Sequence, residues 1–222
     1  MSETVKRSSP LREARKAETE QRIIEAATTR FLADGYAGTT LAAVAAAAGV
    51  GERTVYVRFG NKAELLKRVV DVAVVGDTAD RPLAARGWYR RVREAPTLAE
   101  RVAAYADGAA AMMRRLGPAV AVAQQAEHIE PLIADAAAAG RAGSRAEVAE
   151  IWTAMHADGL LHPDADLDWI ITTVTTLTAA DTYVLMTKML GITPESYRDW
   201  VYDTWMHFAT NPRPAAGPGQ PR

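Results

Sequence analysis

The stretch AGVGERTVYVRFGNKAELL, Ala48–Leu66, places charged and aromatic side chains next to one another within about two helical turns. Gly49 and Gly60 divide it, because glycine readily takes the left-handed conformation that ends a helix. The spacing predicts a short helix over residues 52–59, with another helix before it and another after it. Its mixture of charge and aromatic surface favours a helix that is packed on one side and presents the other side to a partner.

Helical periodicity continues on both sides of this stretch. We expect a first helix from Glu18 to the pair Asp34–Gly35, where the apolar spacing stops. A second helix should cover residues 41–48 after a threonine cap, and a fourth should run from Lys62 to about Val75. Four closely spaced helices are therefore predicted near the N-terminus.

The turn between the second and third of these helices has the composition of a helix-turn-helix. Ala45 is small enough for two helix axes to cross, Gly49 suits the turn, and Val50 and Val55 are apolar plugs. In such a motif the second helix presents its outer face to the DNA major groove. The outward residues of that helix are then Gly51, Glu52, Arg53, Tyr56, Val57 and Arg58.

This part of the chain resembles the N-terminal domain of the TetR (tetracycline-repressor) family of bacterial transcriptional regulators. The family hallmark is a threonine cap, an AGV turn, then T-x-Y-x-x-F followed by a lysine and an acidic residue. The matching positions are Thr40, Ala48–Val50, Thr54, Tyr56, Phe59, Lys62 and Glu64. The resemblance covers about residues 20–70. It departs at Gly51, where serine is usual, and at Arg58, where histidine is often found.

The resemblance implies a set of DNA contacts. Threonines at the start of the second helix suit a phosphate, because their hydroxyls accompany free backbone N–H groups. Glu52 and Arg53 are the expected base readers, and the missing hydroxyl at Gly51 leaves the role of that position open. The residues expected at the DNA are Thr39, Thr40, Gly51, Glu52, Arg53, Tyr56, Arg58 and Lys62.

The charge distribution allows an anionic partner at the N-terminal end. Residues 1–70 carry 12 Lys and Arg against 8 Asp and Glu, whereas the remainder carries 14 against 19. The basic residues of the first 17 positions could add phosphate or minor-groove contacts, although such termini often only aid solubility.

Helix signals also dominate the larger C-terminal part. We expect a short helix around Trp88–Arg93 and further helices over about 98–116, 118–128, 131–159, 167–190 and 194–210. The predicted fold is all-α, with a three-helix helix-turn-helix DNA-binding domain followed by a helical ligand-binding and dimerisation domain. The expected divisions are a disordered basic arm (1–17), the DNA-binding domain with its connecting fourth helix (18–75), the ligand-binding and dimerisation domain (76–210) and a disordered tail (211–222).

The last two expected helices carry wide apolar stripes. A homodimer that pairs this helical hairpin with its twin would cover them, as the resemblance also implies; the alternative is that the stripes fill the chain's own core. Two recognition helices about 34–36 Å apart would then require a roughly palindromic site. The expected interface residues are Leu177, Val184, Tyr197, Val201, Trp205 and Phe208.

The middle of the chain mixes apolar bulk with a few polar tips, the composition that lines small-molecule pockets. Each such residue also has an ordinary structural interpretation, since methionine commonly fills gaps in a core. The residues expected to contact an effector of unknown identity are Met112, Met113, Gln125, His128, Trp152, Met155, Thr173, Thr176 and Tyr183.

Other chemistries lack their signatures. The chain has no cysteine, which excludes disulfides and thiolate zinc sites, and its four histidines lack metal-ligand spacing. Asp164, Asp166 and Asp168 imitate the start of a calcium loop, but Trp169 stands where glycine is required. No apolar run approaches the length that crosses a bilayer. We expect a cytoplasmic protein that is not an enzyme, has no cofactor and does not enter a membrane.

These patterns predict a dimeric TetR-like repressor that leaves a double-stranded DNA operator when a small-molecule effector enters its C-terminal part. The fourth helix would carry that change to the DNA-binding domain. Two alternatives stay open. The same scaffold could act as an activator or without an effector, or the chain could be a helical small-molecule-binding protein or enzyme with a coincidental helix-turn-helix-like motif.

Overall fold

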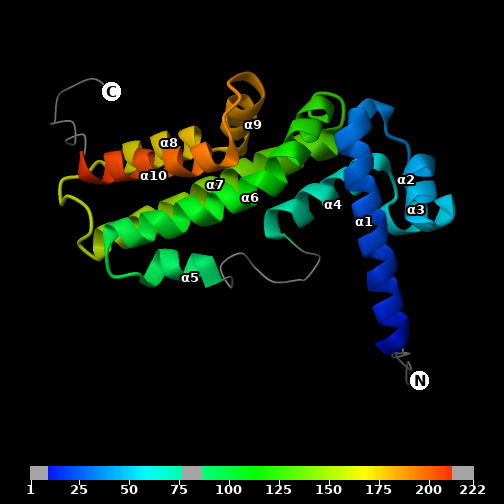
Figure 1. Cartoon of the computed structure of the whole chain (residues 1–222), viewed down its shortest axis with the longest axis horizontal. Helices are drawn as coiled ribbons and strands as arrows, with labels where there is room; N and C mark the ends of the chain where they lie inside the picture. Colours follow the sequence, from blue (N-terminus) through cyan, green and yellow to red (C-terminus); the bar gives the residue numbers. More distant parts are fainter. Residues whose placement is uncertain (1–9, 77–86, 212–222) are drawn as a thin grey trace, which may run out of the picture.

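The computed structural model describes residues 10–76 and 87–211, and within them the regular elements are α-helices, as predicted. Helices α1–α4 form one end of an elongated molecule, and α5–α10 form the rest (Figure 1). None of the described helices is long and apolar enough to cross a membrane. The helices are α1 (Pro10–Gly38), α2 (Leu41–Ala48), α3 (Glu52–Phe59), α4 (Lys62–Val75), α5 (Gly87–Glu94), α6 (Leu98–Ala126), α7 (Pro131–Ala157), α8 (Leu167–Leu177), α9 (Ala180–Met189) and α10 (Pro194–Thr210).

The bounds of α2, α3 and α4 agree with the sequence prediction, and side-chain caps begin α2 and α4. Thr40 accepts a hydrogen bond from the N–H of Ala43 at 3.1 Å, and Gly49 ends α2 with a φ of 63°. Asn61 caps α4 in the same way, accepting from the N–H of Glu64 at 2.8 Å.

α1 begins earlier than the sequence analysis predicted. It starts at Pro10 rather than Glu18, so the expected disordered arm is wrong for residues 10–17. This segment is rich in good helix formers and carries an ion pair of 3.2 Å between Lys16 and Glu13. Residues 1–9 and 212–222, to which the rest of the arm and tail predictions apply, lie outside the described residues.

The helical geometry of α1 breaks at Gly35, with a φ of 68° and a ψ of −177°. The break falls where the apolar periodicity predicted an end. Residues 36–38 continue as a short turn that leads into α2.

Two predicted boundaries in the C-terminal part are wrong. α6 continues through Pro118 instead of restarting there. Pro118 has no N–H to donate to the carbonyl of Arg114. α6 nevertheless continues, and α9 packs closely against it beside this proline: a Cβ on Gly117 would lie 2.3 Å from the ring of Tyr183.

The helix expected over residues 167–190 is in fact α8 and α9. The break comes at Thr178, whose hydroxyl donates to the carbonyl of Val174 at 2.7 Å. The Tyr197 hydroxyl of α10 donates to the carbonyl of Thr178 at 3.4 Å, so this carbonyl has a partner outside its own helix.

Two clusters of buried apolar side chains hold the molecule together. One fills α5–α10 around Trp205. The other joins α1–α4 and includes Ala119, Val122 and Ala126 from α6 and Ile133 from α7. α6 therefore belongs to both cores, and its C-terminal turns pack against α1 and α4.

Candidate nucleic-acid interface

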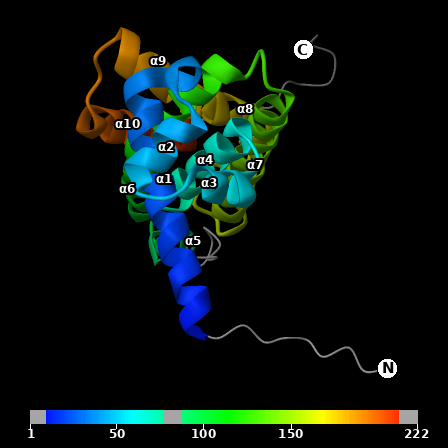
Figure 2. The same ribbon diagram turned by 90° about the vertical axis from the view of Figure 1, so that its right-hand side faces the viewer.

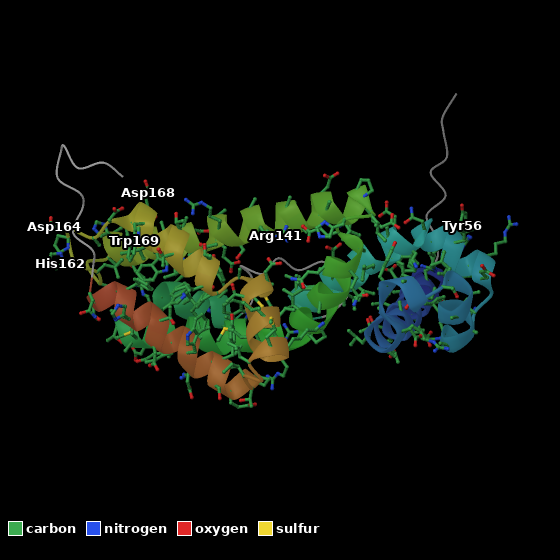
Figure 3. All side chains as sticks on the ribbon, turned by 90° about the horizontal axis from the view of Figure 1, so that it is seen from above. Tyr56, Arg141, His162, Asp164, Asp168 and Trp169 are labelled. Atoms are coloured by element: carbon green, nitrogen blue, oxygen red, sulfur yellow. The ribbon has the colours of Figure 1, made fainter. Side chains whose placement is uncertain are left out.

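α3 is anchored on one face and exposed on the other. Val55 is fully buried, whereas Tyr56 is 63% exposed and Val57 is 73% exposed. Glu52 and Arg53 are also exposed. Figure 3 places Tyr56 at the end of the molecule that α1–α4 form, remote from α8 and α10. The structure thus brings three of the predicted DNA-binding residues, Glu52, Arg53 and Tyr56, onto one outward surface.

A shallow hollow beside α3 is lined by cationic side chains. Its lining residues are Lys16 of α1 and Arg53, Thr54, Val57 and Arg58 of α3. Figure 2 shows α1 extending past α2–α4 at its N-terminal end. Positive side chains beside an exposed helix face suit the phosphate backbone of a duplex. Local sequence patterns had not placed Lys16 next to α3, because that proximity depends on the crossing of two helices.

Gly51 begins α3 without a side-chain cap. Its φ of −70° and ψ of 144° are extended values that any residue adopts. A Cβ at this position would have Thr54 Oγ1 as its nearest neighbour, at 3.9 Å. The backbone does not require glycine here, so serine would fit where this chain lacks a hydroxyl.

The two threonines before α2 have different roles. Thr40 is exposed and caps α2, which leaves it at the surface. Thr39 is buried, 1% exposed, and its hydroxyl donates to the carbonyl of Gly35 at 2.8 Å. The expected phosphate contact from the Thr39 side chain is therefore not supported, because its buried hydroxyl already bonds to the Gly35 carbonyl, at the point where α1 breaks.

Lys62 and Arg58 also have partners within the chain. Lys62 Nζ donates to the carbonyl of Tyr36 at 2.7 Å and lies 4.2 Å from the centre of the Tyr36 ring. Arg58 Nη1 lies 3.8 Å from Glu20 Oε2 of α1, and its side chain is 23% exposed. The expected DNA contact of Lys62 is not supported in this conformation, and Arg58 reaches the hollow only with part of its side chain. Sequence patterns gave no sign of either partner.

The residues expected to bind an effector do not form one site. Gln125 and His128 lie near the end of α6 that contacts α1, where Gln125 Oε1 accepts from the N–H of Tyr36 at 3.0 Å. Thr176 is exposed and donates to the carbonyl of Thr172, while Thr173 is half-buried. The members that share the C-terminal core are Met112, Met113, Trp152, Met155 and Tyr183.

An aromatic cluster lies at the centre of that core. Tyr105 and Trp205 stack with ring centroids 3.7 Å apart, and Trp152 lies 5.2 Å from Trp205. The buried indole N–H groups of Trp152 and Trp205 have no hydrogen-bond acceptor among the described residues. A buried donor without an acceptor is costly, so these two indole groups are unusual within this core.

One carboxyl group lies at the edge of this core. Glu147 of α7 is half-buried. Burial, with a smaller contribution from the charge of Glu150, raises the pKa of Glu147 from 4.5 to about 7. Near pH 7 the Glu147 carboxyl group is therefore neutral in a fraction of the molecules.

The expected dimer residues mostly face the chain's own core. Tyr197, Val201 and Trp205 are fully buried and Val184 is 7% exposed, so these four cannot meet a second copy as surface residues. The interface prediction is wrong for them, and the alternative of a self-filled core holds. Leu177 and Phe208 are half-buried.

α9 exposes apolar side chains other than the residues expected at the interface. Leu185 is 50% exposed, Met189 is 74% exposed and Leu190, just after the helix, is 69% exposed. The spacing of four residues places Leu185 and Met189 on one face of the helix, and Leu190 follows directly at its C-terminal end. A strongly exposed apolar face of this kind marks an interaction surface more often than an isolated apolar residue does.

Within the described part of the chain, no cluster of three or more His, Asp or Glu side chains could hold a metal ion. The acidic segment before α8 has a structural role: Asp166 caps α8 by accepting from the N–H of Trp169 at 3.1 Å, and His162 Nδ1 accepts from the N–H of Asp164. Figure 3 shows His162, Asp164 and Asp168 at the opposite end of the molecule from Tyr56.

The match to known proteins is centred on the DNA-binding end. Residues 23–69 match the family model described as bacterial regulatory proteins, tetR family. The HTH-type transcriptional regulator TtgR of Pseudomonas putida is 48% identical over 54 residues, which are 24% of this chain and 26% of TtgR. The matched segment thus spans about a quarter of the length of this curated relative.

Solved structures extend the similarity to the whole fold. The TetR family transcriptional regulator PfmR of Thermus thermophilus gives a TM-score of 0.62 at 18% identity, over 86% of this chain and 100% of PfmR. A TetR-family structure from Rhodococcus sp. gives 0.65 at 17% identity, over 87% and 99% of the two chains. NalD, the secondary repressor of a multidrug efflux pump in Pseudomonas aeruginosa, gives 0.59 at 15% identity, over 87% and 97%.

Proposed function

Since this chain belongs to the TetR family of bacterial regulatory proteins, we propose that it is a DNA-binding transcriptional regulator whose α3 enters the major groove. The observation that carries the proposal is the outward face of α3, where Glu52, Arg53 and Tyr56 are exposed together next to a cationic hollow. Arg53 is the favoured base reader, because guanidinium pairs with guanine in the major groove. Lys16 and Thr40 are the favoured phosphate contacts.

The regulator acts as a repressor that a small molecule releases. Support comes from NalD, which shares the fold and is named as a repressor. The effector site is the aromatic cluster of Tyr105, Trp152 and Trp205, whose two unpaired indole donors favour a ligand with acceptor atoms. A coupling free energy of about 1–3 kcal/mol between effector and operator would change DNA occupancy several-fold or more.

The working unit is a homodimer formed through the side of the molecule that carries α8, α9 and α10. These helices lie together along one side in Figure 1. Support comes from the exposed apolar face of α9 and from Leu177 and Phe208, the two half-buried residues of the predicted interface. A dimer presents two α3 helices to a roughly palindromic operator.

Selection of bound sequences from a random DNA pool tests the DNA-binding function. We expect an inverted repeat to be enriched by the unmodified protein and lost with Arg53→Ala. The control is Arg90→Ala in α5, an exposed arginine remote from α3, which should preserve the enriched sequence. If no sequence is enriched at low salt, where phosphate contacts are strongest, the proposed function is wrong.

Light scattering tests the dimer. The unmodified protein should be dimeric at micromolar concentration, and Leu185→Asp combined with Met189→Asp should give a folded monomer. Ile129→Asp is the matched control, since Ile129 is 68% exposed but lies between α6 and α7. A monomeric unmodified protein would contradict the proposed assembly.

A further inference from the structure

We propose that Tyr36 is the positioning residue that fixes the DNA-binding helices relative to α6. The proposal rests on the DNA-binding function proposed above. It adds to that function the contacts through which the C-terminal part of the chain sets the direction in which α3 points.

Each polar group of Tyr36 bonds to a different segment of the chain. Its N–H donates to Gln125 Oε1 of α6 at 3.0 Å, and its hydroxyl donates to Glu130 Oε1, between α6 and α7, at 2.6 Å. Its carbonyl accepts from Lys62 Nζ at 2.7 Å. Lys62 is the first residue of α4 and comes three positions after the end of α3. One residue therefore links the end of α1 to α4 and to the C-terminal part of the molecule.

Tyr36 is itself buried, and its three hydrogen bonds are partly buried. Tyr36 is 3% exposed, and its ring lies nearly parallel to that of Phe31, with 9° between the planes. Burial and the neighbouring Glu130 raise the pKa of Tyr36 above its ordinary value, so the hydroxyl stays protonated and remains a donor. Breaking the bond of the Tyr36 N–H or hydroxyl without a replacement would leave a donor of this buried residue without its partner.

The backbone at Gly35 brings α6 close to this residue. The φ of 68° at Gly35 is one that glycine adopts without strain. A Cβ at Gly35 would also lie 2.8 Å from Gln125 Oε1. The Gln125 amide thus rests directly against the break in α1, with little space for the two segments to slide past each other.

The preceding residue of the same turn of α6 is tied to α9. Gln124 Nε2 donates to Asp181 Oδ1 at 3.0 Å, next to the Gln125 that contacts Tyr36. Arg141 of α7, labelled in Figure 3, donates to both Glu127 and Asp181. Asp181 lies in the first turn of α9, the helix that carries the exposed apolar surface. A displacement of α9 therefore has a continuous route through the end of α6 to Tyr36 and α4.

A distance measurement within one chain tests the positioning role without DNA. Because the chain has no cysteine, Val57→Cys on α3 and Ser144→Cys on α7, both exposed, introduce two defined labelling sites. Nitroxide-labelled protein is diluted with excess unlabelled protein, so that only pairs within one chain contribute to the electron-spin distance distribution. We expect one narrow distribution in this background, and a wider or shifted one after Gln125→Met or Tyr36→Phe.

The matched control is Tyr202→Phe, which removes a hydroxyl from α10 and should leave the distribution unchanged. Glu130→Gln keeps the side-chain shape and serves as a second, mild variant at the junction. Circular dichroism should show native helix content for every variant. Distributions of unchanged width and mean in all three junction variants would overturn the proposal.

A second readout uses operator spacing. The selected inverted repeat is lengthened or shortened by one base pair between its half-sites, and binding is followed by fluorescence anisotropy. We expect Tyr36→Phe to reduce the preference for the natural spacing about fivefold or more while affinity for a single half-site is kept. If the unmodified protein binds no DNA, the proposed function fails, and the intrachain distances still decide the role of Tyr36. A spacing preference that the junction variants retain would count against that role.

Discussion

Trp205 of α10 stacks on Tyr105 of α6 with ring centroids 3.7 Å apart and 22° between the ring planes. Trp205 is fully buried, and it lies among the side chains of its own chain. The apolar stripe on α10 is therefore chiefly a core-facing stripe, which changes what its substitution should do.

We expect Trp205→Ala to lower the free energy of unfolding by about 3–5 kcal/mol, because it removes a large buried aromatic side chain and leaves a cavity. Denaturant unfolding followed by far-ultraviolet circular dichroism measures the loss. The half-buried Phe208, changed to alanine, should cost less. A stable Trp205→Ala monomer with little loss of unfolding free energy would instead place Trp205 at a subunit interface.

Gly51→Ser should stabilise the protein and strengthen DNA binding. Serine supplies an N-cap hydroxyl to α3 and restricts the unfolded chain, effects that together amount to a few tenths to about 1 kcal/mol. Thermal unfolding measures the first effect, and operator affinity measures the second. Gly49→Ser is the contrasting variant, since a φ of 63° there strains any side chain. Equal melting temperatures for the two variants would contradict this account.

Arg53→Ala and Lys62→Met should separate DNA contact from internal structure. Arg53 is exposed, so its loss should weaken operator binding while leaving stability nearly unchanged. Lys62 donates to the Tyr36 carbonyl, so its loss should lower the free energy of unfolding by about 1–3 kcal/mol. A salt series on each variant measures the remaining phosphate contacts. A stability loss for Arg53→Ala larger than that for Lys62→Met would reverse these assignments.

The pH dependence of stability should include a contribution from Glu147. Its folded pKa of about 7 lies above its ordinary value of 4.5, so between these values the native state holds more protons than the unfolded state. Stability from this group is therefore present in full below about pH 4.5 and is lost as the pH rises through 7. Glu147→Gln should match the unmodified protein at low pH and exceed its stability above pH 7.

Chemical denaturation at several pH values tests this expectation. Glu94→Gln, which changes an exposed carboxylate at the end of α5, is the control and should show no such divergence. Parallel stability curves for Glu147→Gln and the unmodified protein would mean that Glu147 ionises normally in the folded state.

The sequence predicted those parts of the fold that depend on neighbouring residues. Thr40, Gly49 and Asn61 act on backbone groups within a few positions, so the ends of α2, α3 and α4 could be placed correctly. The break at Thr178 was missed, because the partner of its carbonyl is the Tyr197 hydroxyl of another helix. Pro118 was misread for a similar reason: the packing of Tyr183 against Gly117 is set by the tertiary fold.

The candidate site shows the same division. Periodicity correctly put Val55 inside and Tyr56 outside, because both directions follow from the helical repeat. It failed for Thr39 and Lys62, whose polar groups bond to carbonyls at the end of α1. A surface role and an internal bond require the same kind of side chain, so residue type alone did not distinguish them.

The core that holds α1–α4 together includes side chains from two distant parts of the chain. Ala119, Val122 and Ala126 of α6 and Ile133 of α7 pack there with α1–α4. A chimera that exchanged only residues 1–75 between two regulators would combine the larger part of this core with a foreign remainder from α6 and α7. The transplantable module is therefore discontinuous, and a working exchange of DNA specificity must carry residues 119–133 along with the first four helices.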